Sequence, residues 1–172
     1  MLKKTTYILE TERLSLREFT LRDSAFIMEL LNTPGWIEFI GDRNVKTTAD
    51  AKEYLKNGPL KSYKLNGFGL ALVEIKNNKR AIGMCGIIKR ENLENPDIGF
   101  AFLPEFTGKD FAFEIAKATM DYAKDVLKLP NIFAITVPSN TRSIKLLEKI
   151  GLKFTRAFNF PGDEETLSLF SS

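Results

Sequence analysis

The sequence contains no histidine and a single cysteine, and this limits the chemistry that its side chains can perform. A zinc site built from His and Cys, a Ser-His-Asp triad, a Cys-His pair and a disulfide within one chain are all excluded. Catalysis near neutral pH must then use carboxylates, hydroxyls, Lys, backbone amides or a bound cofactor. Cys85 lies in the apolar run 81–88, and we expect it to be a small core residue.

One stretch of backbone amides is placed to bind an anion. An apolar run at 97–103 leads through a turn near Gly108 directly into a helix expected from about Asp110 to Leu127. The first amides of a helix have no intrahelical acceptor, and the positive end of the helix dipole favours negative charge. The stretch is therefore either an ordinary strand-to-helix connection or a site for an anion such as a pyrophosphate.

A second helix start follows the strand expected over 132–137. Asn140 is placed to cap a helix over 141–150, and Gly151 is placed to end it. One face of this helix carries apolar residues at helical spacing: Ile144, Leu147 and Ile150. Packing explains this face by itself, although the start of the same helix can also face a cofactor.

The remaining elements must position these two helix starts. Alternating or apolar runs predict strands at 14–19, 68–75, 81–90, 152–157 and 166–170, and amphipathic spacing predicts helices from Asp23 to Leu31 and from 47 to about 56. Pro34-Gly35 and Asn57-Gly58-Pro59 are expected to end these helices. The early strands form an antiparallel meander, whereas the late strand-helix-strand unit requires a parallel crossover. The fold class is therefore mixed α/β, with one domain over 1–172.

Composition fits an ordinary globular chain of 172 residues, with 44% hydrophobic and 27% charged residues. The 25 basic and 22 acidic residues leave a net charge of +3, which does not favour a nucleic-acid partner. No stretch approaches 18 apolar residues, and the N-terminus lacks the apolar segment of a signal peptide. We therefore expect a cytoplasmic protein with no membrane partner, and a homodimer is compatible with the sequence.

The residues around both helix starts resemble motifs A and B of the GNAT acetyltransferases. Motif A corresponds to 97–112, and motif B to Asn140-x-x-Ser143-x-x-Leu146-Leu147-Glu148-Lys149-x-Gly151-Leu152. The opening Thr11-Glu12-Arg13-Leu14-x-Leu16-Arg17 is similar to that of the RimJ/RimL-type ribosomal-protein N-terminal acetyltransferases. The resemblance runs from about residue 10 to the end. It implies a GNAT-like central mixed, mostly antiparallel sheet of about seven strands flanked by about four helices.

The resemblance also implies an activity: transfer of an acetyl group from acetyl-CoA, as cosubstrate, to a primary amine, without a metal. Free backbone groups of Phe102 and Leu103 would pair with the pantetheine arm. The pyrophosphate would lie on the loop made of Thr107, Gly108, Lys109, Asp110, Phe111 and Ala112. Asn140, Ser143 and Leu147 would border the pantetheine and acetyl end.

Asp110 departs from the family pattern, which carries Gly at this loop position. A carboxylate about 5 Å from a phosphate charge, at an effective dielectric near 20, costs on the order of 3 kcal/mol. That cost corresponds to roughly a hundredfold in affinity. It disappears if the side chain points away or if Lys109 and Arg142 offset it. The sequence therefore predicts weakened but retained CoA binding.

The residues that perform the acetyl transfer remain open. Many GNAT enzymes use a Tyr as the acid, and the corresponding residue here is Leu147, so the Ser143 hydroxyl is the candidate acid. Asp97 is the candidate base, acting through water; the alternative is an ordinary acid at the end of a strand. Trp36, Phe39 and Phe100 either line the amine pocket or belong to the core.

Two functions follow from this reading. The first is an N-acetyltransferase that acts on a protein N-terminus or a small amine. The second is a catalytically impaired GNAT-fold module that binds acyl-CoA and acts through a protein partner, which Asp110 and the missing Tyr would favour.

Overall fold

The computed structural model describes residues 5–172 and builds them around one eight-stranded sheet. The strand order is β1-β2-β3-β4-β5-β6-β8-β7. The strands are β1 (Tyr7–Glu10), β2 (Leu14–Arg17), β3 (Leu70–Ile75), β4 (Ala81–Ile88), β5 (Asp97–Phe102), β6 (Phe133–Thr136), β7 (Lys153–Phe158) and β8 (Leu167–Ser171). Every neighbouring pair is antiparallel except β5 and β6, which are parallel. The expectation of a mixed, mostly antiparallel sheet is confirmed.

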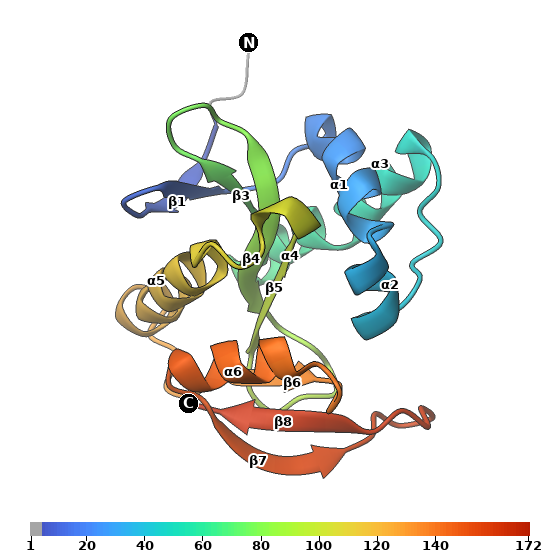
Figure 1. Cartoon of the computed structure of the whole chain (residues 1–172), viewed down its shortest axis with the longest axis vertical. Coiled ribbons are helices and arrows are strands. Elements are labelled where there is room, and N and C mark those ends of the chain that lie inside the picture. Colours follow the sequence, from blue (N-terminus) through green and yellow to red (C-terminus); the bar gives the residue numbers. More distant parts are fainter. Residues whose placement is uncertain (1–4) are drawn as a thin grey trace.

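Six α-helices surround this sheet in the described part of the chain. They are α1 (Ser24–Leu31), α2 (Pro34–Phe39), α3 (Thr48–Asn57), α4 (Pro59–Asn66), α5 (Phe111–Asp125) and α6 (Thr141–Lys149). Two 3₁₀ turns, η1 (Leu21–Asp23) and η2 (Pro104–Phe106), precede α1 and α5. Figure 1 shows α5 on one side of β4 and β5 and α1 to α3 on the other, with α6 beside β6 and β8. None of the helices in residues 5–172 is long and apolar enough to cross a membrane.

The core fills the space between the sheet and its helices. Its largest fully buried side chains include Phe19, Phe170, Leu14, Leu16, Ile27, Leu72, Met84 and Ile115. Cys85 is completely buried, and its thiol donates a hydrogen bond to the Thr119 hydroxyl at 3.5 Å. The interpretation of Cys85 as a core residue is confirmed, and the contact shows that this face of β4 packs against α5.

Three elements were missed by the sequence analysis: β1, α2 and α4. Pro34 and Pro59 were interpreted as helix ends, but each stands in the first turn of a new helix. Proline fits there because that position needs no backbone donor and its fixed φ is already helical. For α2, the Thr33 side chain also accepts a hydrogen bond from the Trp36 amide. The counts of about seven strands and four helices are therefore one strand and two helices short.

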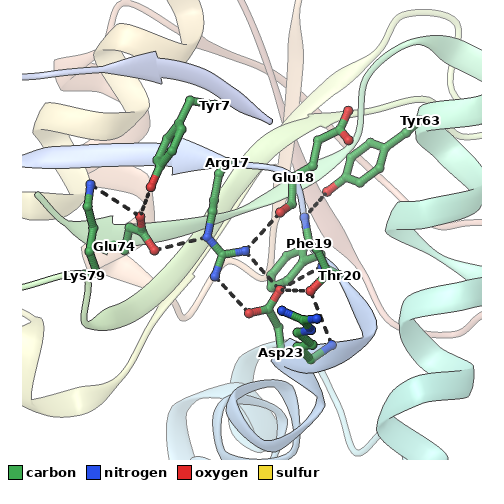
Figure 2. Close-up of polar contacts among 10 residues, drawn as sticks. Tyr7, Arg17, Glu18, Phe19, Thr20, Asp23, Tyr63, Glu74 and Lys79 are labelled. Atoms are coloured by element: carbon green, nitrogen blue, oxygen red, sulfur yellow. Dashed lines mark hydrogen bonds and ion pairs between the residues drawn. The ribbon is translucent and has the colours of Figure 1, made fainter. Parts of the chain in front are cut away.

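An ion-pair network ties the first strands of the sheet to the turn before α1. The Arg17 guanidinium donates from Nε to Glu74 at 3.1 Å and from Nη2 to Asp23 at 2.9 Å. Tyr7 donates its hydroxyl to the same Glu74, and Lys79 lies 3.9 Å from it (Figure 2). Glu74 is only 3% exposed, so its charge is compensated within the network.

Candidate functional site

The parallel strands β5 and β6 separate almost as soon as they meet. Their ladder holds a single registered pair, Asp97 opposite Phe133, with the Phe133 amide donating to the Pro96 carbonyl at 2.8 Å. Six residues of β5 are registered against β4 over the same stretch. The sheet is therefore opened between β5 and β6 from residue 98 onward, toward the loops that start α5 and α6.

The opened edge of β5 presents backbone groups to this gap. The Leu103 amide donates to Ile82 of the neighbouring segment at 2.9 Å, and the Leu103 carbonyl accepts from Phe106 at 3.0 Å. Because backbone groups alternate sides along a strand, those of Phe100 and Phe102 point away from β4 and into the gap. Phe102 can thus pair with an added chain, whereas Leu103, also expected to do so, has both backbone groups engaged.

The loop between β5 and α5 turns twice through the left-handed region. Gly108 has φ 75° and Asp110 has φ 61°. The first helical hydrogen bond runs from the Glu114 amide to the Asp110 carbonyl. Within the described residues, the amides of 108–113 have no hydrogen-bond acceptor, while the Thr107 hydroxyl is already bonded to the Pro104 carbonyl. Unpaired amides at the start of a 15-residue helix form a site that fits a diphosphate.

Cationic side chains surround this loop, each held on an aromatic ring. The Arg13 guanidinium carbon lies 4.4 Å from the centroid of the Phe111 ring. Arg80 and Lys109 lie 4.7 Å and 5.4 Å from the Phe106 ring. Cation–π contacts hold these long basic side chains in place. Arg13 and Arg80 also pair with Glu114 and Glu105, so within residues 5–172 Lys109 is the one cation of the three without an ion pair. The loop therefore combines free amide donors with nearby positive charge.

The Asp110 side chain points outward and meets a residue to which the sequence analysis gave no role at this loop. It is 78% exposed, and its carboxylate lies 3.7 Å from the Lys149 ammonium at the end of α6. Lys149 in turn lies 4.0 Å from the centroid of the Phe113 ring. The offsetting cation was expected to be Lys109 or Arg142, but Lys149 makes the contact because α6 packs against α5.

Glu114 anchors the start of α5 to the turn between β1 and β2. Its carboxylate accepts from the Thr11 hydroxyl at 2.6 Å, from the Arg13 amide at 2.9 Å and from Arg13 Nε at 2.7 Å. Partial burial acts to raise the pKa of Glu114, but these hydrogen bonds outweigh it and hold the pKa below its usual value. The Thr-Glu-Arg opening of the chain therefore fixes the helix that carries the loop.

The start of α6 is capped as expected. The Asn140 side chain accepts from the Ser143 amide at 3.2 Å, and Ser143 itself is half-buried in the first turn. Leu147, expected to border the cofactor, is only 1% exposed and packs in the core. Of the three residues expected here, Asn140 and Ser143 have surface available to a ligand.

Asp97 begins β5 at the closed end of the gap. It is 1% exposed, and its carboxylate accepts from Arg90 Nε at 2.9 Å. Burial raises the pKa of Asp97, and the adjacent Arg90 opposes that change. The carboxylate is thus held by a partly exposed cation at the point where β5 and β6 diverge.

The aromatic residues expected around the amine are divided between two elements. Trp36 and Phe39 lie on α2, and Phe100 lies on β5. Trp36 is 6% exposed, and within residues 5–172 its indole Nε1 has no hydrogen-bond acceptor. An unpaired buried donor costs roughly 1–3 kcal/mol, so this N–H is an unsatisfied donor within α2. Phe39 and Phe100 are half-buried.

The sequence analysis missed Arg13, Arg80 and Lys149 as residues around the loop. Arg13 belongs to the Thr11–Arg17 segment and Lys149 belongs to motif B, so both lie in segments already identified from the sequence. Their contacts with α5, however, depend on how distant elements pack. Arg80 carried no local signal, because it reaches Phe106 only through the pairing of β4 with β5. In the described residues, no group of three His, Cys, Asp or Glu side chains is arranged to hold a metal ion.

Comparison with known proteins agrees with this geometry. A family model for the acetyltransferase (GNAT) domain matches residues 13–153. The uncharacterized protein YkkB of Bacillus subtilis (strain 168) is 30% identical over 151 residues, which cover 86% of each chain. The chain therefore belongs to the GNAT acetyltransferase family.

Solved structures support the same fold. An acetyltransferase from Agrobacterium tumefaciens str. C58 has a TM-score of 0.81 at 22% identity. The match covers 100% of this chain and 95% of the Agrobacterium chain. RimL, a ribosomal L7/L12 alpha-N-protein acetyltransferase solved with coenzyme A, has a TM-score of 0.80 at 12% identity. The match covers 96% of this chain and 97% of the RimL chain. Ribosomal-protein acetyltransferases of the expected branch are thus among its structural neighbours.

Proposed function

We propose that this protein transfers an acetyl group from acetyl-CoA to a primary amine. The observation that carries the proposal is the opening of the sheet between β5 and β6 beside six unpaired amides of residues 108–113. A thiol arm that pairs with Phe102 in the gap leads directly to a diphosphate held at the start of α5. Membership of the GNAT family supports the assignment of acetyl-CoA as the donor.

The reaction follows from this placement of the thioester. The neutral amine attacks the thioester carbonyl carbon, and a C–N bond forms while negative charge develops on the carbonyl oxygen. A backbone amide of the opened β5 edge stabilises that charge. The C–S bond then breaks, the thiolate takes a proton, and the amine nitrogen loses one.

Ser143 and Asp97 are the proposed proton donor and acceptor. Ser143 is half-buried in the first turn of α6, the helix that follows β6, and in the proposal its hydroxyl donates to the departing sulfur. Asp97 lies where the gap closes and accepts the amine proton through water. Replacing Asp97 by Asn should remove the acidic limb of the pH profile of kcat/KM, because activity is lost at low pH when the base is protonated. Replacing Ser143 by Ala should lower kcat more than it changes KM.

The acceptor is proposed to be an alpha-amino group of a protein or a small amine. The name of RimL, which acetylates a protein alpha-amino group, supports the first of these. The free indole N–H of Trp36 suits a substrate that presents a carbonyl oxygen near its amine. Such an oxygen occurs in an N-terminal peptide and is absent from a simple alkylamine.

Free-thiol release from acetyl-CoA, measured over N-terminal peptides and small amines, tests the proposal. Turnover is expected with at least one class of amine. Cys85 contributes no background, because burial raises the pKa of its thiol to about 12. Acetyl-CoA that binds without turnover on any amine would instead support the impaired module, which Asp110 and Leu147 favour.

A further inference from the structure

A cavity lies beside the C-terminal half of α5, away from the loop at residues 108–113. Its volume is about 170 Å³, comparable to cavities that hold a benzene-sized ligand. It is lined by β1 and β2, by the end of α4 and the start of β3, by β4, and by the C-terminal half of α5. Thr119 and Leu127 mark its position along α5, whereas the unpaired amides precede residue 114.

The only carboxylate that lines this cavity is that of Glu18, and in the described part of the chain it takes part in no ion pair or hydrogen bond. The neighbouring guanidinium of Arg17 is occupied by Glu74, by Asp23 and by the backbone carbonyl of Glu18. Figure 2 shows the Glu18 carboxylate projecting away from Arg17 and Asp23, beside the Tyr63 ring. The cavity therefore carries an uncompensated negative charge.

Aromatic residues make up much of the remaining lining: Tyr7, Tyr63, Phe68 and Tyr122. The Tyr63 hydroxyl is already used, since it donates to the Leu70 carbonyl and accepts from the Phe19 amide. The Thr119 hydroxyl donates to the Ile115 carbonyl. The cavity thus offers ring surfaces and one free carboxylate. The Tyr7 ring is not available to a ligand, because its hydroxyl donates to Glu74 and Lys79 already lies 5.0 Å from its centroid, so the rings that remain are those of the other three residues.

We propose that this cavity is a binding site for a small organic ammonium ion, separate from the site of acetyl transfer. A carboxylate supplies a charge-assisted hydrogen bond to an ammonium group, and aromatic rings attract its positive charge and cover its alkyl part. A neutral or anionic molecule of the same size lacks the first interaction or is repelled. The ammonium ion and acetyl-CoA occupy different sites. We therefore expect that neither changes the affinity of the other.

Titration of the intact protein with n-butylammonium, followed by amide NMR shifts in the absence of acetyl-CoA, tests the proposal. Saturable shifts are expected at Gly69 and Tyr122, which line the cavity, and not at Gly108. Because n-butanol has the same shape without the charge, its affinity should be at least about tenfold lower. Glu18→Gln should reduce the affinity for butylammonium to that for butanol.

Glu91→Gln is the matched control, since Glu91 is an exposed acid outside the cavity, and it should leave binding unchanged. Glu18→Gln should also keep its acetyl-CoA affinity, which separates this site from the proposed transferase function. Equal binding of butanol and butylammonium, unchanged affinity in Glu18→Gln, shifts centred on Gly108, or no saturable shift at tens of millimolar would each overturn the proposal.

Discussion

Asp110 shows how one side chain is tolerated in the loop that we propose binds a diphosphate. Its φ of 61° belongs to the left-handed region, where Gly is preferred and Asp is among the few tolerated alternatives. The carboxylate is exposed and paired with Lys149, so water and a cation screen it from a bound phosphate. With a dielectric near that of water, the repulsion between this carboxylate and a phosphate charge about 5 Å away falls to about 1 kcal/mol. That is well below the cost at an effective dielectric near 20.

Two substitutions at this position separate charge from backbone conformation. Asp110→Asn should tighten acetyl-CoA binding by about fivefold, because it removes only the charge. Asp110→Gly should do the same and also raise Tm by a few degrees, because it relieves the left-handed backbone. Calorimetric titration measures the affinity for acetyl-CoA, and thermal unfolding measures Tm. Asp121→Asn, on the exposed face of α5, is the control; an unchanged affinity in Asp110→Asn would show that Lys149 already cancels the charge.

At the scale of the elements, the contact of the β1–β2 turn with α5 fixes the loop in space. Glu114→Gln should lower the free energy of unfolding at neutral pH by about 1 kcal/mol, since the acceptor of charge-assisted hydrogen bonds becomes neutral. The pKa of Glu114 is depressed in the folded state, so the stabilisation is complete above the unfolded pKa and is lost as pH falls through the folded one. Urea unfolding should show the two proteins converging as the pH falls below the ordinary pKa of Glu, about 4.3, and on through the lower folded pKa.

The control for this change is Glu105→Gln, whose pair with Arg80 is half-exposed on both sides. Exposed pairs contribute little, so its stability should match that of the wild type at every pH. A gap between wild type and Glu114→Gln that persisted at acid pH would contradict the assignment to the ionised carboxylate.

The opened strand β5 makes a second prediction at this scale. Phe102→Pro removes an amide that faces the gap and breaks no bond to β4, so the protein should fold while its affinity for acetyl-CoA falls about tenfold. Phe102→Ala removes the ring and keeps the amide, and it is the matched comparison. If both substitutions weakened binding equally, the ring and not the amide would contact the ligand.

For the whole molecule, ligand binding and folding are linked. Acetyl-CoA at about one hundred times its Kd should stabilise the protein by about 2.7 kcal/mol, which corresponds to a rise in Tm of roughly 5–10 °C for a chain of this size. Adenosine, which lacks the diphosphate and the thiol arm, should produce almost no shift. A shift with adenosine equal to that with acetyl-CoA would place the binding energy outside the loop at residues 108–113.

The sequence by itself determined whatever depends on local backbone chemistry. Gly108 predicted the turn before α5, Asn140 predicted the cap of α6, and the absence of histidine excluded whole classes of catalysis. The same local rules also produced errors. Pro34 and Pro59 were predicted to end helices, and α2 and α4 were missed, because a proline that ends one helix also suits the first turn of the next.

Only the tertiary structure decided which distant residues meet. The separation of β5 from β6, the pairing of Asp110 with Lys149, the cations around the loop and the unpaired Glu18 all depend on contacts between residues far apart in the sequence. Spacing along the chain specifies the face of an element on which a side chain lies. It does not specify what that face packs against, because packing is a property of the complete fold.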